Sequence, residues 1–182
     1  AELRQLENKQ WEQITLPHTP FVEPLTVLHQ WQGICYYKKK ITITPEEAKK
    51  HIWIEFEGAM HLADVWINGK HVMQHAGGYT PFVVDATGLL KTGKENELLV
   101  RLDNRNNSLI PPGKPLETLD FCYYGGIYRN VHLIAKADVH ITHPILDGHP
   151  AGAGIFITYP KVSQELSVVD AKTEIKNTSD KE

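Results

Sequence analysis

The chain has 182 residues, of which 41% are hydrophobic and 23% charged, and this ordinary globular composition excludes a disordered or fibrous protein. Its 19 Lys and Arg residues stand against 22 Asp and Glu residues, giving a net charge of -3, so we expect neutral partners and no nucleic acid. Its apolar runs are far shorter than the roughly 20 residues that cross a bilayer, and we expect no membrane insertion. The two cysteines, Cys35 and Cys122, could form at most one disulfide and lack the spacing of a zinc or redox motif.

The first predicted strand spans Cys35 to Ile43. The only helix candidate follows it, from Pro45 to Lys50, with Thr44 as the N-cap and Glu47 placed to close a capping box. Because this segment is barely longer than one turn, we expect a connector and not a packed helix.

Strict alternation then predicts half-buried strands over residues 52–57 and 98–103. Between them, residues 63–67 lead into Asn68-Gly69, the residue pair most typical of a tight two-residue hairpin turn. Lys70 to His75 should therefore return antiparallel. In the segment from His75 to Phe82, we expect Tyr79 and Phe82 to pin the loop to the core.

Many short strands with almost no helix predict an all-β fold in which two antiparallel sheets pack face to face as a jelly-roll-like sandwich. We assign residues 1–137 to this sandwich, which closes with a strand that buries Val131 and Leu133. Residues 138–182 offer only three further strands, near 139–143, 155–159 and 169–175. Because such a small sheet buries too little area to stand alone, we expect an incomplete second sandwich and a chain cut from a longer protein.

The ten histidines invite a metal interpretation that their spacing does not support. His71 and His75 are four residues apart in a predicted strand, which separates their Cα atoms by about 13 Å. His140 and His143 are expected on opposite faces of a strand. We assign no histidine to a metal site, and we expect the tryptophans of the sandwich strands to be core residues.

The most unusual stretch runs from Asp120 to Arg129, where a carboxylate precedes an aromatic cluster and two glycines. Aromatic rings pack on the apolar faces of sugars, and a carboxylate accepts hydrogen bonds from their hydroxyls. The structural alternative is that the tyrosines are core or rim residues, Gly125-Gly126 forms a bulge and Asp120 caps a turn. The chemistry alone favours this structural alternative.

The stretch from Leu119 to Ile134 resembles the end of the N-terminal sugar-binding domain of family 2 glycoside hydrolases, the β-galactosidase and β-glucuronidase family. Further segments resemble that domain in the same order along the chain: Leu16–Thr19, Trp31–Lys39, Val65–Gly69, His75–Phe82, Asp103-Asn104 and Ile110–Gly113. The resemblance covers residues from about 11 to 137. It implies a galactose-binding-domain-like sandwich, followed by the start of an immunoglobulin-like sandwich in residues 138–182.

In that family, as the resemblance implies, the two catalytic glutamates lie in a (β/α)₈ barrel further along the chain. One aspartate of the sandwich contacts the substrate, and it matches Asp120. In some β-galactosidases the same aspartate also ligates a monovalent cation, so Na⁺ and Mg²⁺ are candidate ions of a parent enzyme, with Asp120 as a metal ligand, while the fragment itself needs no cofactor. Tyr124 and Arg129 are candidate supporting residues, Arg129 by bracing Asp120 or a domain boundary.

The resemblance implies that the chain is the N-terminal part of a retaining β-glycosidase whose substrate is a β-galactoside or related oligosaccharide. We expect this parent enzyme to be a β-galactosidase, with a β-glucuronidase or a β-mannosidase as the alternatives. We expect the fragment alone to be inactive, because no pair of its carboxylates can be argued to flank a scissile bond at about 5 Å. The parent is expected to be a homo-oligomer, in the periplasm or the cytoplasm of a bacterium. The alternatives are a stand-alone carbohydrate-binding module and a scaffold in which Asp120 is structural.

Overall fold

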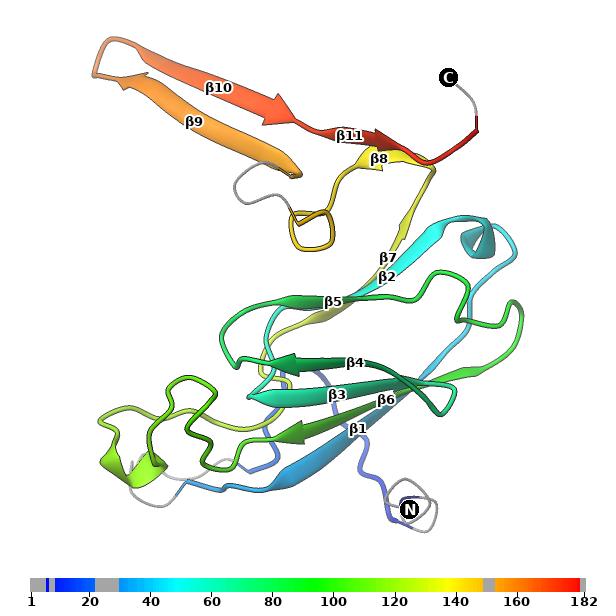
Figure 1. The fold of residues 1–182 in the computed structure, drawn as a ribbon, viewed down its shortest axis with the longest axis vertical. Helices are drawn as coiled ribbons and strands as arrows, with labels where there is room; N and C mark the ends of the chain where they lie inside the picture. The colour runs from blue at the N-terminus through cyan, green and yellow to red at the C-terminus, as the bar shows by residue number, and fades with distance from the viewer. Residues whose placement is uncertain (1–5, 7–8, 22–29, 149–152, 181–182) are drawn as a thin grey trace.

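The computed structural model describes residues 6, 9–21, 30–148 and 153–180, and its elements are almost all β-strands (Figure 1). None of its described helices is long and apolar enough to cross a membrane. The strands are β1 (Ile34–Ile41), β2 (His51–Phe56), β3 (Leu62–Ile67), β4 (Lys70–Ala76), β5 (Phe82–Asp85), β6 (Asn96–Asp103), β7 (Val131–Lys136), β8 (Val139–Ile141), β9 (Ile155–Val162), β10 (Ser167–Thr173) and β11 (Ile175–Asn177). Within residues 30–148, 3₁₀ helices span Glu47–Lys49 and Leu116–Thr118.

Two antiparallel sheets stack to form the sandwich, which confirms the predicted fold class (Figure 1). One sheet has the strand order β1-β6-β3-β4 and the other the order β5-β2-β7. Alternate side chains of each strand fill the space between the sheets. Phe56 of β2 stacks on Phe82 of β5 with ring centroids 4.5 Å apart, and Leu102 of β6 is completely buried in the same core.

The local turn signals of the sequence are confirmed. Asn68 and Gly69 have φ angles of 51° and 78°, the left-handed values that a tight hairpin turn requires. The capping box also forms, since the backbone N–H of Thr44 donates to Glu47 Oε2 at 2.8 Å and that of Glu47 to Thr44 Oγ1 at 3.2 Å. These hydrogen bonds hold the pKa of Glu47 below its usual value, and the segment they cap is the short connector that was expected.

Two details of the predicted strands are wrong. The first strand ends at Ile41, because Ile43 leaves it to form an isolated parallel bridge with Thr92. Leu133 is 43% exposed although its neighbours Val131 and Ala135 pack on the core, since β7 is an edge strand of its sheet.

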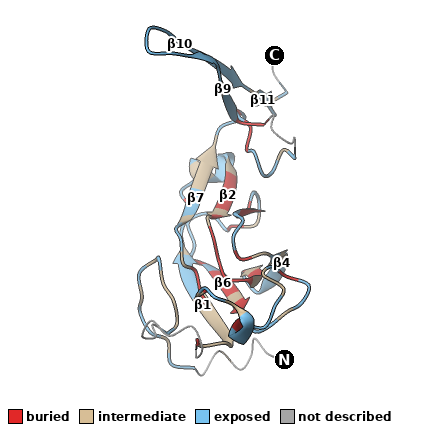
Figure 2. Cartoon of the chain, turned by 90° about the vertical axis from the view of Figure 1, so that its left-hand side faces the viewer, coloured by how far each residue is buried: buried red, intermediate tan, exposed pale blue. Residues whose placement is uncertain are grey.

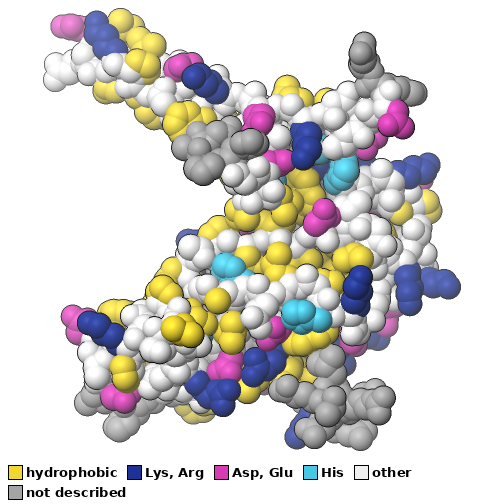
Figure 3. Space-filling model, viewed as in Figure 1, with side chains coloured by type: hydrophobic (Ala, Val, Ile, Leu, Met, Phe, Trp, Pro, Cys, Tyr) yellow, Lys and Arg dark blue, Asp and Glu magenta, His cyan; other side chains and the backbone are white. Residues whose placement is uncertain are grey.

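The strands after the sandwich bury little. Among the residues that the structure describes, β9 pairs only with β10, and β8 only with β11, and every residue of β10 and β11 is exposed. Figures 1 and 2 show the β9–β10 hairpin projecting away from the sandwich. Figure 3 shows a hollow between this hairpin and the sandwich, with hydrophobic side chains at its base. The strand expected over residues 169–175 is interrupted at Glu174, whose backbone N–H donates to Gly154 O at 3.0 Å.

Trp53 lies where residues 140–143, which follow the sandwich in the sequence, pack against it. It lies on the outer face of β2 and is nevertheless only 5% exposed. The rings of His140 and His143 pack edge-on against it, with centroids at 5.3 and 5.4 Å. The expectation that these two histidines lie on opposite faces is therefore wrong, because β8 ends at Ile141 and His143 lies beyond the regular strand.

We expect Trp53→Ala to lower the free energy of unfolding by about 3–5 kcal/mol, because it empties a site enclosed by two parts of the chain. Urea denaturation monitored by circular dichroism would measure the loss. Trp66→Ala is the matched control, since Trp66 also lies on an outer sheet face but is only half-buried. Equal losses from the two variants would contradict the enclosing role of residues 140–143.

Candidate functional site

Asp120 lies just after the 3₁₀ helix Leu116–Thr118, in a bend with an exposed side chain. Figure 1 places this helix at the end of the molecule opposite the β9–β10 hairpin. Within the described ranges, no hydrogen bond or ion pair engages the Asp120 carboxylate. Its neighbour in sequence, Phe121, is 43% exposed, so a carboxylate and an aromatic ring from consecutive residues are both exposed to solvent.

The segment that follows Asp120 is held firmly through Tyr123. This residue is only 4% exposed, its backbone N–H donates to Gln30 Oε1 at 3.0 Å, and its hydroxyl accepts a hydrogen bond from Gln32 Nε2 at 3.2 Å. Its ring stacks on that of His61, with centroids 6.3 Å apart. Burial raises the pKa of the Tyr123 phenol, although the hydrogen bond from Gln32 opposes this shift.

The two glycines let the same segment lie directly on the sandwich. A Cβ atom on Gly126 would lie 2.5 Å from Tyr37 Oη and 2.7 Å from the carbonyl oxygen of His18. Gly126 also has a φ of 103°, a value that residues with a side chain rarely adopt. In this position its carbonyl accepts a hydrogen bond from the Met60 backbone N–H at 2.9 Å. The segment is therefore fixed at Gly126, six residues after Asp120, while Asp120 stays exposed.

The side chain of Asn104 packs against the neighbouring glycine, Gly125. This side chain is buried, with Oδ1 accepting from the Gly33 backbone N–H at 2.8 Å and Nδ2 donating to the Trp31 carbonyl at 3.0 Å. A Cβ atom on Gly125 would lie 2.7 Å from that Nδ2 atom. The buried amide and the bare glycine therefore fit together, which explains their presence in two separate segments of the sequence.

Asp103, a buried carboxylate next to Asn104, forms ion pairs with two arginines. Arg105 approaches its carboxylate to 2.6 Å and Arg101 to 3.2 Å. Burial opposes the ionisation of Asp103, but hydrogen bonds from Arg105 and the charges of both arginines outweigh it and hold the pKa below its usual value.

The supporting residues predicted from the sequence lie in different surroundings. Tyr124 is half-buried beside Tyr123. Arg129 is exposed, and the start of its side chain lies over Gly58, where an added Cβ would meet Arg129 Cδ at 3.1 Å. Among the described residues no ion pair joins Arg129 to Asp120.

The loop of residues 77–80 approaches the same segment from another part of the chain. The Tyr128 hydroxyl donates a hydrogen bond to the Gly78 carbonyl. Phe82 is buried in the core as predicted, but the prediction that Tyr79 also pins the loop is wrong, since its side chain is 51% exposed. The hydrogen bond from Tyr128 holds the loop and leaves the Tyr79 ring free to face solvent.

His61 and Gln30 are parts of the site that the sequence did not reveal. Both side chains are buried, and His61 Nδ1 and Gln30 Nε2 have no hydrogen-bond partner in the described structure. Burial lowers the pKa of His61, while the charge of Asp103 and a hydrogen bond with the Arg105 backbone oppose this shift. Neither residue belongs to a recognisable motif, so only the fold reveals their contact with Tyr123.

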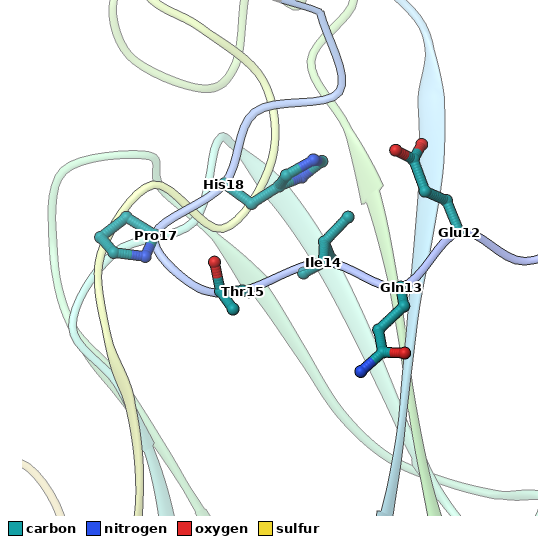
Figure 4. A pocket seen from close by; sticks show the side chains of 6 residues that line it. All are labelled: Glu12, Gln13, Ile14, Thr15, Pro17 and His18. Carbon is teal, nitrogen blue, oxygen red and sulfur yellow. The ribbon is translucent and has the colours of Figure 1, made fainter.

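Other polar features of the described residues are structural. Glu57 binds Asn130 and His132, with the His132 contact at 3.1 Å, and Glu55 lies 3.7 Å from His143. No group of three or more His, Cys, Asp or Glu side chains among the described residues could hold a metal ion. An open hollow is lined by six residues of one extended segment, Glu12, Gln13, Ile14, Thr15, Pro17 and His18 (Figure 4), and it includes no residue of the Asp120 segment.

The sequence matches a known family over residues 9–137, the sugar binding domain of glycosyl hydrolases family 2. Among characterised relatives, a β-glucuronidase of Formosa agariphila is 33% identical over 92% of this chain, and a β-galactosidase of Thermoanaerobacter pseudethanolicus is 33% identical over 94%. The matched regions are 18% and 24% of those proteins, so the chain spans less than a quarter of their length.

Solved structures agree with this match. A putative β-galactosidase from Bacteroides fragilis superposes with a TM-score of 0.78 at 30% identity, covering 97% of this chain and 25% of its own. A β-glucuronidase from Bacteroides uniformis superposes with a TM-score of 0.74 at 32% identity, covering 93% of this chain and 19% of its own. The resemblance first seen in the sequence motifs is thereby confirmed.

We expect Gly126→Ala to destabilise the protein more than a change at an unhindered glycine. Gly88 is the matched control, since its φ is also positive, at 72°, but a Cβ there meets nothing within 4 Å. Gly88→Ala should cost about 1–2 kcal/mol of unfolding free energy for its backbone conformation, and Gly126→Ala about 1–3 kcal/mol more for the overlap with Tyr37 and His18. Urea denaturation would measure both, and equal losses would contradict the close packing of the segment.

We also expect stability to fall on mild acidification because of His61. A histidine whose pKa in the folded state lies below the usual value of about 6.5 stabilises the fold fully above that pH. As the pH falls from about 6.5 towards the lowered value, the unfolded chain binds a proton that the folded chain does not, and this contribution is lost. Urea midpoints at pH 7.5, 6 and 5 would show the decline, and His61→Gln should reduce it. An unchanged slope in that variant would contradict the assignment to His61.

Proposed function

Because this chain belongs to glycosyl hydrolase family 2 and contains the sugar binding domain of that family, we propose that it is the substrate-recognition part of a β-glycosidase. In this proposal Asp120 accepts hydrogen bonds from hydroxyls of the terminal sugar. The observation that carries it is the exposed carboxylate of Asp120 at the start of a segment fixed by Tyr123 and Gly126.

The position of the Asp120 carboxylate must be set before the sugar binds. An exposed carboxylate is well hydrated, so it binds a sugar usefully only when its position is already set before the sugar arrives. The hydrogen bonds of Tyr123 and the close packing of Gly126 on Tyr37 supply that fixed frame. A carboxylate held in this way can accept two hydroxyl hydrogen bonds at once, and contacts of this kind favour the transition state when they strengthen as the reaction proceeds.

The catalytic carboxylates are proposed to come from the remainder of the enzyme. Retaining glycosidases need two carboxyl groups about 5 Å apart on either side of the scissile bond. In this chain Glu55 faces His143, and Glu57 is held by Asn130 and His132. Both serve the packing of the fold, so the fragment alone should have no hydrolytic activity.

The substrate is proposed to be a β-galactoside or a β-glucuronide. The expectation that a β-galactoside is preferred has no specific support, because the relatives carry both names at nearly the same identity. Asp120 would accept hydrogen bonds from hydroxyls that both sugars possess, so this residue by itself does not choose between them.

A bound monovalent ion at Asp120 stays a proposal derived from the family. The described residues bring no three His, Cys, Asp or Glu side chains together in a group suited to a metal, and Asp120 offers a single carboxylate. We therefore assign no step of substrate binding to Na⁺ or Mg²⁺.

We predict that Asp120→Ala in the full-length enzyme lowers kcat/KM by roughly two orders of magnitude. Losing a hydrogen bond to a charged partner costs on the order of 2–4 kcal/mol of transition-state stabilisation. Steady-state hydrolysis of nitrophenyl β-galactoside and nitrophenyl β-glucuronide would measure the effect and identify the preferred sugar.

Asp170→Ala is the control, because Asp170 is an exposed aspartate on β10 and should leave the rate unchanged. A rate for Asp120→Ala within twofold of the wild type would remove Asp120 from the site. Binding of galactose to the 182-residue chain alone, tighter than about 1 mM, would favour the alternative of an autonomous carbohydrate-binding module.

A further inference from the structure

We propose that Tyr79 forms the aromatic wall of the saccharide site to which Asp120 contributes the carboxylate. This inference rests on the proposed function and deepens it, because it assigns a specificity-determining contact to a loop that lies 40 residues earlier in the chain. The ligand would be the pyranose ring of the terminal sugar, packed through its C–H face on the tyrosine ring.

The first support is that Tyr79 is exposed on a loop that is itself fixed. The Gly77 backbone N–H donates to the His61 carbonyl at 2.9 Å, and Thr80 Oγ1 lies 3.3 Å from His75 Nε2. Between these two anchors the Tyr79 side chain keeps 51% of its surface exposed. A large aromatic ring that a rigid loop holds in water is a feature of binding surfaces, because little conformational freedom is lost when a ligand packs on it.

The second support is that this loop is joined to the segment of Asp120. The Tyr128 hydroxyl donates to the carbonyl of Gly78, the residue just before Tyr79. Gly78 itself lies against Met60, and a Cβ atom there would overlap the Met60 sulfur. Met60 packs in one small cluster with Tyr123 and Tyr128, and its backbone N–H donates to Gly126.

The electrostatics of Tyr79 agree with this placement. Partial burial raises the pKa of its phenol, and the nearby phenols of Tyr128 and Tyr123 raise it further. Tyr79 therefore lies within electrostatic range of two tyrosines that follow Asp120 and stays in its neutral form at ordinary pH, with its hydroxyl able to donate a hydrogen bond.

The combination of groups fits a saccharide better than an apolar partner. Tyr79 and Phe121 offer exposed rings, while Asp120 offers a carboxylate with no partner among the described residues. An apolar partner would leave that carboxylate desolvated without a hydrogen bond. A sugar satisfies both needs, since its ring carbons pack on aromatic faces and its hydroxyls donate to the carboxylate.

The test uses the full-length enzyme with Tyr79→Ala and Tyr79→Phe, next to Asp120→Ala and the control Tyr159→Ala on β9, whose side chain is also exposed, at 62%. Hydrolysis of nitrophenyl β-galactoside, β-glucuronide and β-mannoside gives kcat and KM, and thermal denaturation gives Tm. We expect Tyr79→Ala to raise KM about three- to tenfold with an unchanged Tm, and Tyr79→Phe, which keeps the ring and loses only the hydroxyl, to raise KM less than Tyr79→Ala does, while Tyr159→Ala stays within twofold of the wild type.

The other outcomes separate this inference from the function it rests on. If Asp120→Ala loses activity and Tyr79→Ala does not, Tyr79 is no part of the site, and the proposed function stands. If Tyr79→Ala lowers Tm and kcat but leaves KM unchanged, Tyr79 packs on another part of the enzyme, and the inference is overturned. If the wild type hydrolyses none of the three substrates, or if Asp120→Ala has no effect, the proposed function fails and this inference fails with it.

Discussion

The close approach of the chain at Gly126 is the constraint on which the candidate site depends. Only a residue without a side chain leaves room for Tyr37 and His18 on one side and for the hydrogen bond from Met60 on the other. That approach draws the segment from 119 to 130 onto the end of the sandwich. Once it is there, Tyr123 can bury its ring against His61, and Tyr128 can reach the loop of Gly78.

The parts of the fold that the sequence predicts well are those set by neighbouring residues. The Asn68-Gly69 turn and the Thr44–Glu47 capping box depend on contacts within four residues, and both form as expected. The alternation in β2 likewise places Ile52, Ile54 and Phe56 in the core, because a strand directs every second side chain to the same face.

The predictions that fail are those that depend on contacts distant in sequence. His140 and His143 are predicted on opposite faces of a strand, yet both pack against Trp53 at an outward position of β2. Tyr79 is a large aromatic residue of the kind that anchors a loop to the core, yet its side chain is exposed and the hydrogen bond from Tyr128 to Gly78 holds its loop. His61 and Gln30 carry no motif at all, and their contacts with Tyr123 exist only because the fold brings together the segments that precede β1, β3 and β7.

The residues that make the candidate site rigid are different from the residues that it exposes to solvent. The groups that fix the position of the segment are buried, as Asn104, Tyr123 and His61 illustrate, and their hydrogen bonds form at folding and not at binding. The exposed groups of the proposed site, Asp120 and Tyr79, make almost none of these bonds, so in that proposal they lose no internal contact when a sugar binds. Because the ordering cost of the site is met when the protein folds, a small number of exposed contacts can be sufficient to recognise a hydrated sugar. A recognition surface of this kind needs no catalytic carboxylate of its own, which is consistent with Glu55 and Glu57 serving the packing of the fold.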